Sequence, residues 1–287
     1  MTTTLSRPPV PVTAPVSPAR QSRGRRRLTS ALPLALLGFS LVIGTWYLTV
    51  DVLALPRFRA LPGPSEVVKE WVATDPAYGT SLFTPEYYDH ILASVRRVAI
   101  AFLLALGLGV PLGIALGWSK RFREYGFPVF ELIRPIPILA WVPLAILMFE
   151  GSESPVVFLT FLAAFYAVTL NAMLGVESID PSLVRAARCL GAGPWSVVRT
   201  VVIPGALPSL FTGLQIAMGV AWFSLVAGEM IAGRFGLGYL VNSSYTTTRY
   251  PTIVIAMLTL GIVGYASSAL IRAVGNRLMS YRARGAS

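Results

Sequence analysis

Charged residues are scarce in this chain of 287 residues, at 13% of the total. A soluble domain carries about 25% charged residues, so this composition excludes an ordinary soluble protein. Hydrophobic residues reach 54%, and the mean hydropathy is +0.65. These values indicate an integral membrane protein before any single segment is considered.

Several chemical groups are also missing. Cysteine and histidine occur once each, at Cys189 and His90, which rules out an internal disulfide and the usual zinc ligands. The Gly-x-x-x-x-Gly-Lys-Ser/Thr loop that cradles ATP in many ATPases is absent. Paired carboxylates and a nucleophile beside a base are absent too. We therefore expect no enzyme activity, and no cofactor or metal, on this chain.

Six apolar stretches are long enough to cross a bilayer, whose hydrocarbon core requires about 20 helical residues. They cover residues 30–53, 91–118, 126–149, 155–176, 206–232 and 251–272. The runs are continuous and do not alternate between apolar and polar residues, which argues against a β-barrel. The sequence therefore predicts an all-α membrane protein with about six transmembrane helices.

The composition of the N-terminal region indicates a tail followed by a first transmembrane span that is not cleaved off. Residues 1–29 are rich in Pro, Ser, Thr and Arg, which predicts a disordered basic tail. The stretch from 30 to 53 has some features of a secretory signal, including a passable cleavage site. Its apolar core of about twenty residues exceeds the 7–15 of a signal peptide, so we favour an uncleaved span.

The net charge of +11 is unevenly distributed. Most basic residues lie in the tail, at 120–123, at 185–199 and near the C-terminus, and six spans place these clusters on one side. By the positive-inside rule, that side is the cytoplasm and holds both termini. This distribution explains the basic composition without nucleic acid, and no basic groove interleaved with aromatic residues is present.

The second span carries small residues at four-residue spacing. Gly109, Gly113 and Gly117 continue a face that also holds Ala101 and Ala105. Small residues at this spacing let the backbones of two membrane helices approach closely. We expect this face to pack against another span.

The polar stretch between the fourth and fifth spans predicts two short helices joined by a tight turn. Asp180 suits an N-cap, and Pro181 suits the first helical turn. Gly191 fits the left-handed position that ends a helix. A second helix is expected at 195–202, and Pro204 is expected to break the chain where it re-enters the membrane.

This stretch resembles the cytoplasmic coupling motif of bacterial ABC importer permeases, which is Glu-Ala-Ala, three residues, Gly, nine residues, Ile, any residue, Leu-Pro. Arg185 stands where that pattern has Glu. The matching positions are Ala186, Ala187, Gly191, Val201, Ile203 and Pro204. The resemblance implies that an ATPase subunit docks on Arg185, Ala186, Ala187, Arg188, Gly191, Trp195 and Pro204.

The likeness extends over about residues 60–275. Within the importers, the chain looks like the permeases for nitrate, taurine, alkanesulfonates and bicarbonate. The supporting stretches are residues 61–67, 94–98, 134–137, 205–214, 226–230 and 236–240. The resemblance implies a type I ABC importer permease fold, with one transmembrane domain at 30–287, a core at 88–275 and coupling helices at 180–204.

The same resemblance implies a function and a set of partners. The chain would be the permease subunit of an ATP-driven importer for a small anion, in a bacterial inner membrane. A second permease chain, most simply an identical one, would complete the path. Two ATPase subunits would bind ATP and Mg, and an extracytoplasmic binding protein would deliver the substrate. Some related permeases carry neutral vitamin precursors, which leaves a second substrate class open.

Polar groups at membrane depth are costly and are therefore candidates for the substrate path. The candidates are Arg97, Arg134, Asn171, Gln215, Trp222, Ser224 and Glu229. Each has a simpler alternative: Arg97 could anchor lipid headgroups, and Arg134 could snorkel to the interface. Glu229 would repel an anion, which favours pairing with an arginine or a helix end. The uncharged candidates are more often packing contacts between helices.

A transporter or channel driven by ion gradients is the alternative function. Such a protein needs intramembrane carboxylates or a histidine relay, and the predicted spans offer little beyond Glu229.

Overall fold

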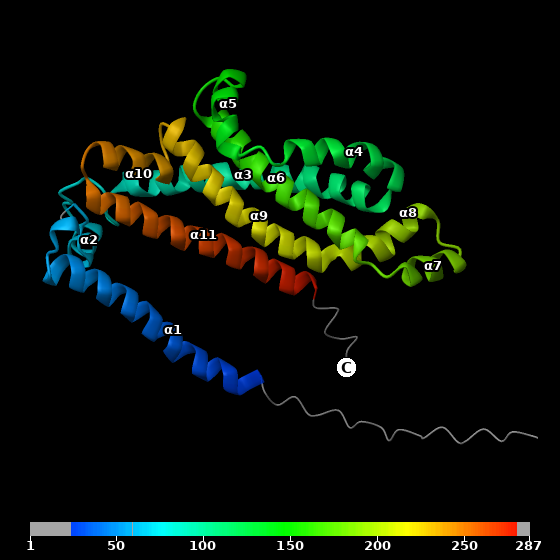
Figure 1. Cartoon of the computed structure of the whole chain (residues 1–287), viewed down its shortest axis with the longest axis horizontal. Coiled ribbons are helices and arrows are strands. Elements are labelled where there is room, and N and C mark those ends of the chain that lie inside the picture. The colour runs from blue at the N-terminus through cyan, green and yellow to red at the C-terminus, as the bar shows by residue number, and fades with distance from the viewer. Residues whose placement is uncertain (1–23, 59, 280–287) are drawn as a thin grey trace, which may run out of the picture.

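The computed structural model describes residues 24–58 and 60–279, and every regular element among them is helical (Figure 1). The first helix, α1, begins at Gly24, so residues 24–29 of the predicted tail are helical. The rest of that tail lies outside the described residues.

Four helices in the described part of the chain are long and apolar enough to cross a membrane. They are α3 (Pro85–Trp118), α6 (Glu153–Glu177), α9 (Ile203–Ile231) and α11 (Tyr250–Leu278). These helices correspond to the predicted second, fourth, fifth and sixth spans. Shorter elements join them: η2 (Pro56–Phe58), α2 (Pro64–Trp71), α7 (Pro181–Cys189), α8 (Pro194–Val197), η4 (Val198–Val202) and α10 (Leu237–Thr246).

The predicted third span is not one straight helix. It is divided into α4 (Lys120–Ile133) and a segment made of η3 (Ile138–Trp141) and α5 (Val142–Met148), and the two are bent by 84°. Pro135 and Pro137 lie in the break, and proline disfavours a continuing helix at and before its own position. The last turns therefore project away from the bundle as α5 (Figure 1).

The first predicted span, residues 30–53, is helical over residues 30–52. Helix α1 (Gly24–Tyr47) continues into a π-helical turn, η1 (Leu48–Val52), and residues 36–52 of this stretch form an apolar helix. Residues 36–45 are exposed, and α1 lies apart from the bundle except near α2 (Figure 1). The expected six spans are thus four long helices, a bent pair that can count as a fifth, and this shorter apolar helix.

Helices α3, α6 and α9 form the centre of the bundle through close backbone approach. Ala101, Ala105, Gly109 and Gly113 are buried on α3, and the last two lie against α6. A Cβ added at Gly117 would lie 2.7 Å from the Cβ of Val176, well inside ordinary contact. The small-residue face predicted for the second span is therefore confirmed as a helix-packing surface.

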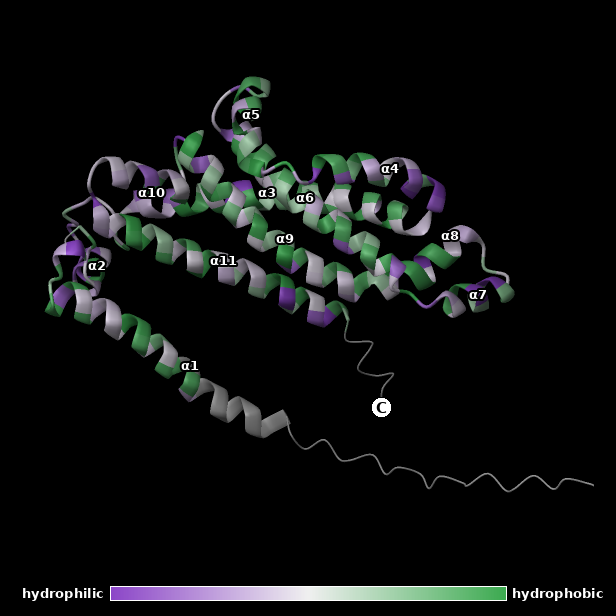
Figure 2. Ribbon diagram, viewed as in Figure 1, coloured by the Kyte–Doolittle hydropathy of each residue, from purple (hydrophilic) through white to green (hydrophobic). Residues whose placement is uncertain are grey.

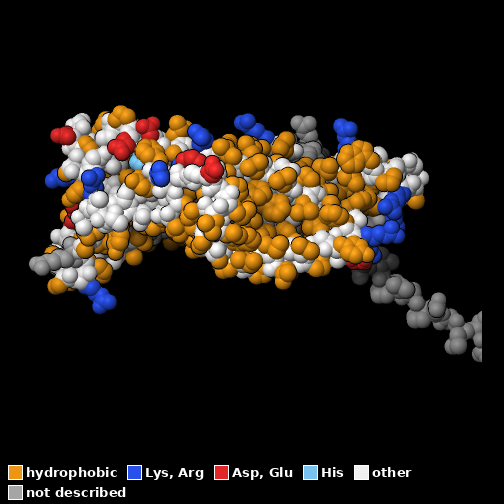
Figure 3. Space-filling view, turned by 90° about the horizontal axis from the view of Figure 1, so that it is seen from above, with side chains coloured by type: hydrophobic (Ala, Val, Ile, Leu, Met, Phe, Trp, Pro, Cys, Tyr) orange, Lys and Arg blue, Asp and Glu red, His pale blue; other side chains and the backbone are white. Residues whose placement is uncertain are grey.

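The outside of the bundle suits a bilayer. The long helices are largely hydrophobic along their length (Figure 2), and hydrophobic side chains cover the middle of the face in Figure 3. Most of the charged side chains on that face lie toward the two ends of the long axis (Figure 3). This distribution leaves an apolar band between two polar ends, as a hydrocarbon core requires.

We expect Gly113→Ala to destabilise the protein by roughly 1–3 kcal/mol, the usual cost of overpacking. The new methyl group would overlap the carbonyl oxygen of Thr169, which is backbone and cannot turn away. Gly107→Ala on the same helix is the control, because a Cβ there meets nothing within 4 Å. Thermal unfolding in detergent measures both variants. Both substitutions gain the same helix propensity, because Ala favours a helix more than Gly does. Equal unfolding midpoints for the two variants would therefore contradict the close α3–α6 contact.

Candidate functional site

The coupling segment, residues 180–204, begins with the predicted cap. The Asp180 carboxylate accepts a hydrogen bond from the Ser182 backbone N–H at 2.8 Å, and Pro181 opens α7. This hydrogen bond holds the pKa of the Asp180 carboxyl below its usual value. Gly191 follows the helix with φ +86°, the left-handed conformation that the sequence predicted.

The coupling segment protrudes from one end of the bundle (Figure 1). All residues of α7 are exposed or half-exposed, including Arg185, Ala186 and Arg188. Two large apolar side chains also face outward, Leu190 at 89% exposure and Trp195 at 75%. An apolar surface of this kind with a cationic rim is suited to binding a partner protein.

Pro204 does not break the chain, contrary to the sequence-based expectation. The helix is continuous from Pro194 to Ile231. Its second turn, η4, is π-helical, and the Ile203 N–H donates to the Val198 carbonyl five residues earlier. The wider turn lets the chain continue as α9 through a proline that would otherwise clash with the preceding turn.

In the half of α3 far from the coupling segment, Arg97 lies at the centre of an ionic cluster. Its side chain is only 1% exposed. Its Nη1 donates to Glu229 Oε1 at 2.6 Å and to the Phe235 carbonyl at 2.6 Å. Its Nε donates to Glu153 Oε2 at 2.9 Å, and its Nη2 pairs with Glu153 Oε1. One buried guanidinium therefore joins carboxylates from α6 and α9.

Glu229 is completely buried, and two groups besides Arg97 donate hydrogen bonds to it. The Ser94 hydroxyl donates to its carboxylate at 2.9 Å, and the Gly238 N–H in the first turn of α10 donates at 2.8 Å. The two alternatives considered for Glu229 are thus both present, an arginine partner and a helix end. A buried carboxylate needs such partners because burial removes its hydration.

The same cluster fixes the loop between α9 and α10. The Gly236 N–H donates to His90 Nδ1 at 3.0 Å, and the His90 ring stacks on Phe235 with 4.0 Å between ring centroids. The Leu237 N–H donates to the Ser94 hydroxyl at 2.9 Å. His90, Ser94 and Arg97 therefore form one polar face of α3 that binds this loop.

The other predicted path residues do not join this cluster. The Trp222 Nε1–H donates to the Ser267 hydroxyl at 2.9 Å, and the Ser224 hydroxyl donates to the Leu159 carbonyl at 3.0 Å. These two contacts tie α9 to α11 and α6. Asn171 and Gln215 each donate to a carbonyl one turn back on their own helix. Arg134 is exposed and pairs with Glu131 at 3.2 Å.

Three members of the cluster were missed as site residues in the sequence. His90 and Ser94 precede Arg97 by seven and three residues, so helical periodicity alone places all three on one face. Glu153 follows a loop and starts α6, and no periodicity in the sequence relates it to Arg97.

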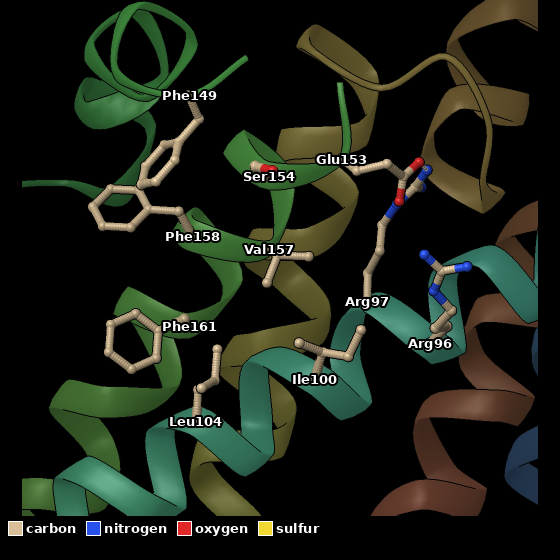
Figure 4. Close-up of a pocket in the computed structure, with 10 residues that line it drawn as sticks. All are labelled: Arg96, Arg97, Ile100, Leu104, Phe149, Glu153, Ser154, Val157, Phe158 and Phe161. Atoms are coloured by element: carbon tan, nitrogen blue, oxygen red, sulfur yellow. Dashed lines mark hydrogen bonds and ion pairs between the residues drawn. The ribbon is translucent and has the colours of Figure 1, made fainter. Parts of the chain in front are cut away.

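A cavity of about 400 Å³ opens beside the cluster, between α3 and the first turns of α6. Arg96, Arg97 and Glu153 lie at one end, and phenylalanine rings lie at the other (Figure 4). Its full lining is Arg96, Arg97, Ile100, Leu104, Phe149, Glu153, Ser154, Val157, Phe158 and Phe161. The cavity thus combines a charged end with an apolar wall.

Residues 109–281 match the model of the family described as binding-protein-dependent transport system inner membrane component. The chain belongs to this family. It is therefore the permease subunit of an ABC importer, as its coupling segment indicated.

Several relatives of this permease cover most of both chains. A probable ABC transporter permease protein of Brucella abortus is 36% identical and spans 90% of this chain and 98% of its own. The taurine transport system permease protein TauC of Escherichia coli is 33% identical and spans 91% of this chain and 94% of its own. The nitrate import permease protein NrtB of Leptolyngbya laminosa is 30% identical, over 88% and 90%.

Solved ABC importers share the fold of this permease. An inward-facing structure of the MetNI methionine ABC transporter matches with a TM-score of 0.57 and 19% identity, over 67% of this chain and 94% of that chain. A bacterial alginate ABC transporter with its pentasaccharide-bound periplasmic protein matches with a TM-score of 0.59 and 14% identity, over 89% and 96%. The predicted type I ABC importer permease fold is confirmed.

We expect Arg97→Met to destabilise the permease by about 3–5 kcal/mol, because it leaves the Glu229 carboxylate buried without its cation. The control is Arg123→Met, which breaks a half-exposed pair with Glu177 at 2.5 Å and should cost about 1 kcal/mol or less. Adding Glu229→Gln to Arg97→Met should restore part of the loss. Unfolding in detergent measures all three. Equal losses for the two arginine variants would contradict a central role for Arg97.

Proposed function

We propose that this permease carries a small anion of the nitrate, sulfonate or taurine, or bicarbonate class, and that two copies enclose the path. The observation that carries the proposal is the exposed coupling segment at the cationic end of a bundle whose relatives include taurine and nitrate permeases. The alternative of a neutral vitamin precursor has no comparable support among these named relatives.

The energy for transport comes from separate subunits in this proposal. The sequence has no phosphate-binding loop, so ATP and Mg are bound by two ATPase subunits. These subunits dock on Arg185, Ala186, Ala187, Arg188, Gly191, Trp195 and Pro204. An extracytoplasmic binding protein delivers the substrate at the opposite end.

The proposed orientation places both termini and the coupling segment in the cytoplasm. The described C-terminal end of α11 points toward the end of the bundle that carries α7 and α8 (Figure 1). Lys120, Arg121, Arg185, Arg188 and Arg199 flank the spans at that end, which agrees with the positive-inside rule.

A gradient-driven mechanism fits the structure less well. That alternative requires an intramembrane carboxylate that is free to exchange ions or protons. Glu229 is instead completely buried and engaged by Arg97, Ser94 and Gly238.

Reconstitution into liposomes tests the proposal. The permease, its cognate ATPase and its binding protein are combined, and uptake of radiolabelled taurine, ethanesulfonate, nitrate and bicarbonate is measured with and without ATP. We expect uptake of at least one anion that requires all three proteins and ATP. Uptake by the permease alone, or uptake driven by an ion gradient without ATP, would overturn the proposal.

Gly191→Val is expected to uncouple the ATPase. A β-branched residue is strained at φ +86°, so α7 would end differently and its docking surface would shift. Gly193→Val is the matched control, because Gly193 has φ −69° and a Cβ at either glycine meets nothing within 4 Å. Co-purification of the ATPase should fall at least tenfold for Gly191→Val alone. Retention of the ATPase by both variants would argue against docking at this segment.

A further inference from the structure

The cavity beside Arg97 has the features of a substrate site. We propose that it binds a small organic anion with a short aliphatic chain, and that Glu153 occupies the place of the anionic group until substrate arrives. The inference rests on the proposed function and narrows its substrate class to alkanesulfonates and similar carboxylates.

The N–H groups of Arg97 bind two carboxylates, of which one is buried and the other is partly exposed to solvent. Its Nη1 points inward to Glu229 and the Phe235 carbonyl, and the contact with Glu229 is buried. Its Nε and Nη2 form a two-pronged contact with Glu153 on the cavity side (Figure 4). This pair of parallel donors matches a carboxylate, and equally the oxygens of a sulfonate.

Glu153 is the carboxylate that can leave. Its side chain is 53% exposed, whereas that of Glu229 is fully buried and has two further donors. Glu153 is the first residue of α6 and follows Gly151, which has φ +79°. A released Glu153 carboxylate therefore enters water, and no unpaired charge is buried. Arg96 lines the same cavity as Glu153 and provides a second cation there.

The rest of the cavity favours a substrate with an apolar part. Ile100, Leu104, Val157, Phe158 and Phe161 form the wall that leads away from the arginines (Figure 4). Nitrate and bicarbonate have no apolar part that could contact this wall. Each buried methylene strengthens binding roughly fourfold, so chain length should raise affinity until the wall is filled.

The test measures binding to the permease–ATPase complex in detergent without the binding protein, so that only sites on the complex contribute. Calorimetric titrations use nitrate, ethanesulfonate and butanesulfonate. We expect the order butanesulfonate, ethanesulfonate, nitrate, with roughly fourfold per added methylene. Glu153→Gln should tighten butanesulfonate binding roughly tenfold, because it replaces a charged competitor at Arg97 with a neutral one.

Glu177→Gln is the matched control. Glu177 is the last residue of α6, as Glu153 is the first, and it also pairs with an arginine, Arg123, at 2.5 Å. Its loss should leave the dissociation constants unchanged. Val157→Phe, which fills the apolar wall, should abolish the gain with chain length while the complex still assembles.

The binding and stability measurements separate a substrate site from a purely structural ion pair. A purely structural Arg97–Glu153 pair predicts that Glu153→Gln lowers the melting temperature and leaves anion binding unchanged, and that result would overturn the proposal. Binding independent of chain length, or unaffected by Val157→Phe, would overturn it as well. The proposed function fails separately, if the complete wild-type system shows no ATP-dependent uptake of any anion.

Discussion

The buried guanidinium of Arg97 is the contact on which one end of the bundle depends. It lies on α3, and its partners come from the start of α6, the end of α9 and the loop before α10. Removing a cation from water is costly, and that cost is offset by the Glu229 carboxylate, the Phe235 carbonyl and an anionic group at the position of the Glu153 carboxylate. The arginine therefore requires four elements to meet at one point, which nonspecific apolar packing would not achieve.

Helix α6 links that point to the coupling segment. Its first residue, Glu153, pairs with Arg97, and its last residue, Glu177, pairs with Arg123 on α4. Between these pairs, small residues of α3 let the two helices pack along much of their length. A helix of 25 residues is roughly 38 Å long, enough to cross the hydrocarbon core. Asp180 and α7 follow the end of α6 almost directly. A change in the tilt of α6 would therefore move both the Arg97 cluster and the coupling segment.

Hydropathy, capping residues and small-residue spacing predicted most of the fold. The spans other than the third, the α7 cap at Asp180 and the glycine face of α3 are present because each depends on nearby residues in sequence. The bend in the third span was missed although its prolines are visible in the sequence, and the other failures involve contacts made over long separations or an unusual helical turn. Glu153 meets Arg97 only because a loop returns α6 to α3. Helical spacing could have grouped His90 and Ser94 with Arg97, but only the fold shows which loop they bind.

The π-helical turn before Pro204 changes how docking can act on the bundle. With a break at the proline, α8 would move separately from the membrane helix. Instead the helix is continuous from Pro194 to Ile231. Trp195 near its start and Glu229 near its end therefore belong to the same helix. Helix α7, by contrast, ends at Gly191 and is joined to that continuous helix only through a short turn. In the proposed complex, an ATPase subunit docked on α7 would hold that helix while α9 tilts as a unit, and any tilt would have to be accommodated at the Arg97 cluster.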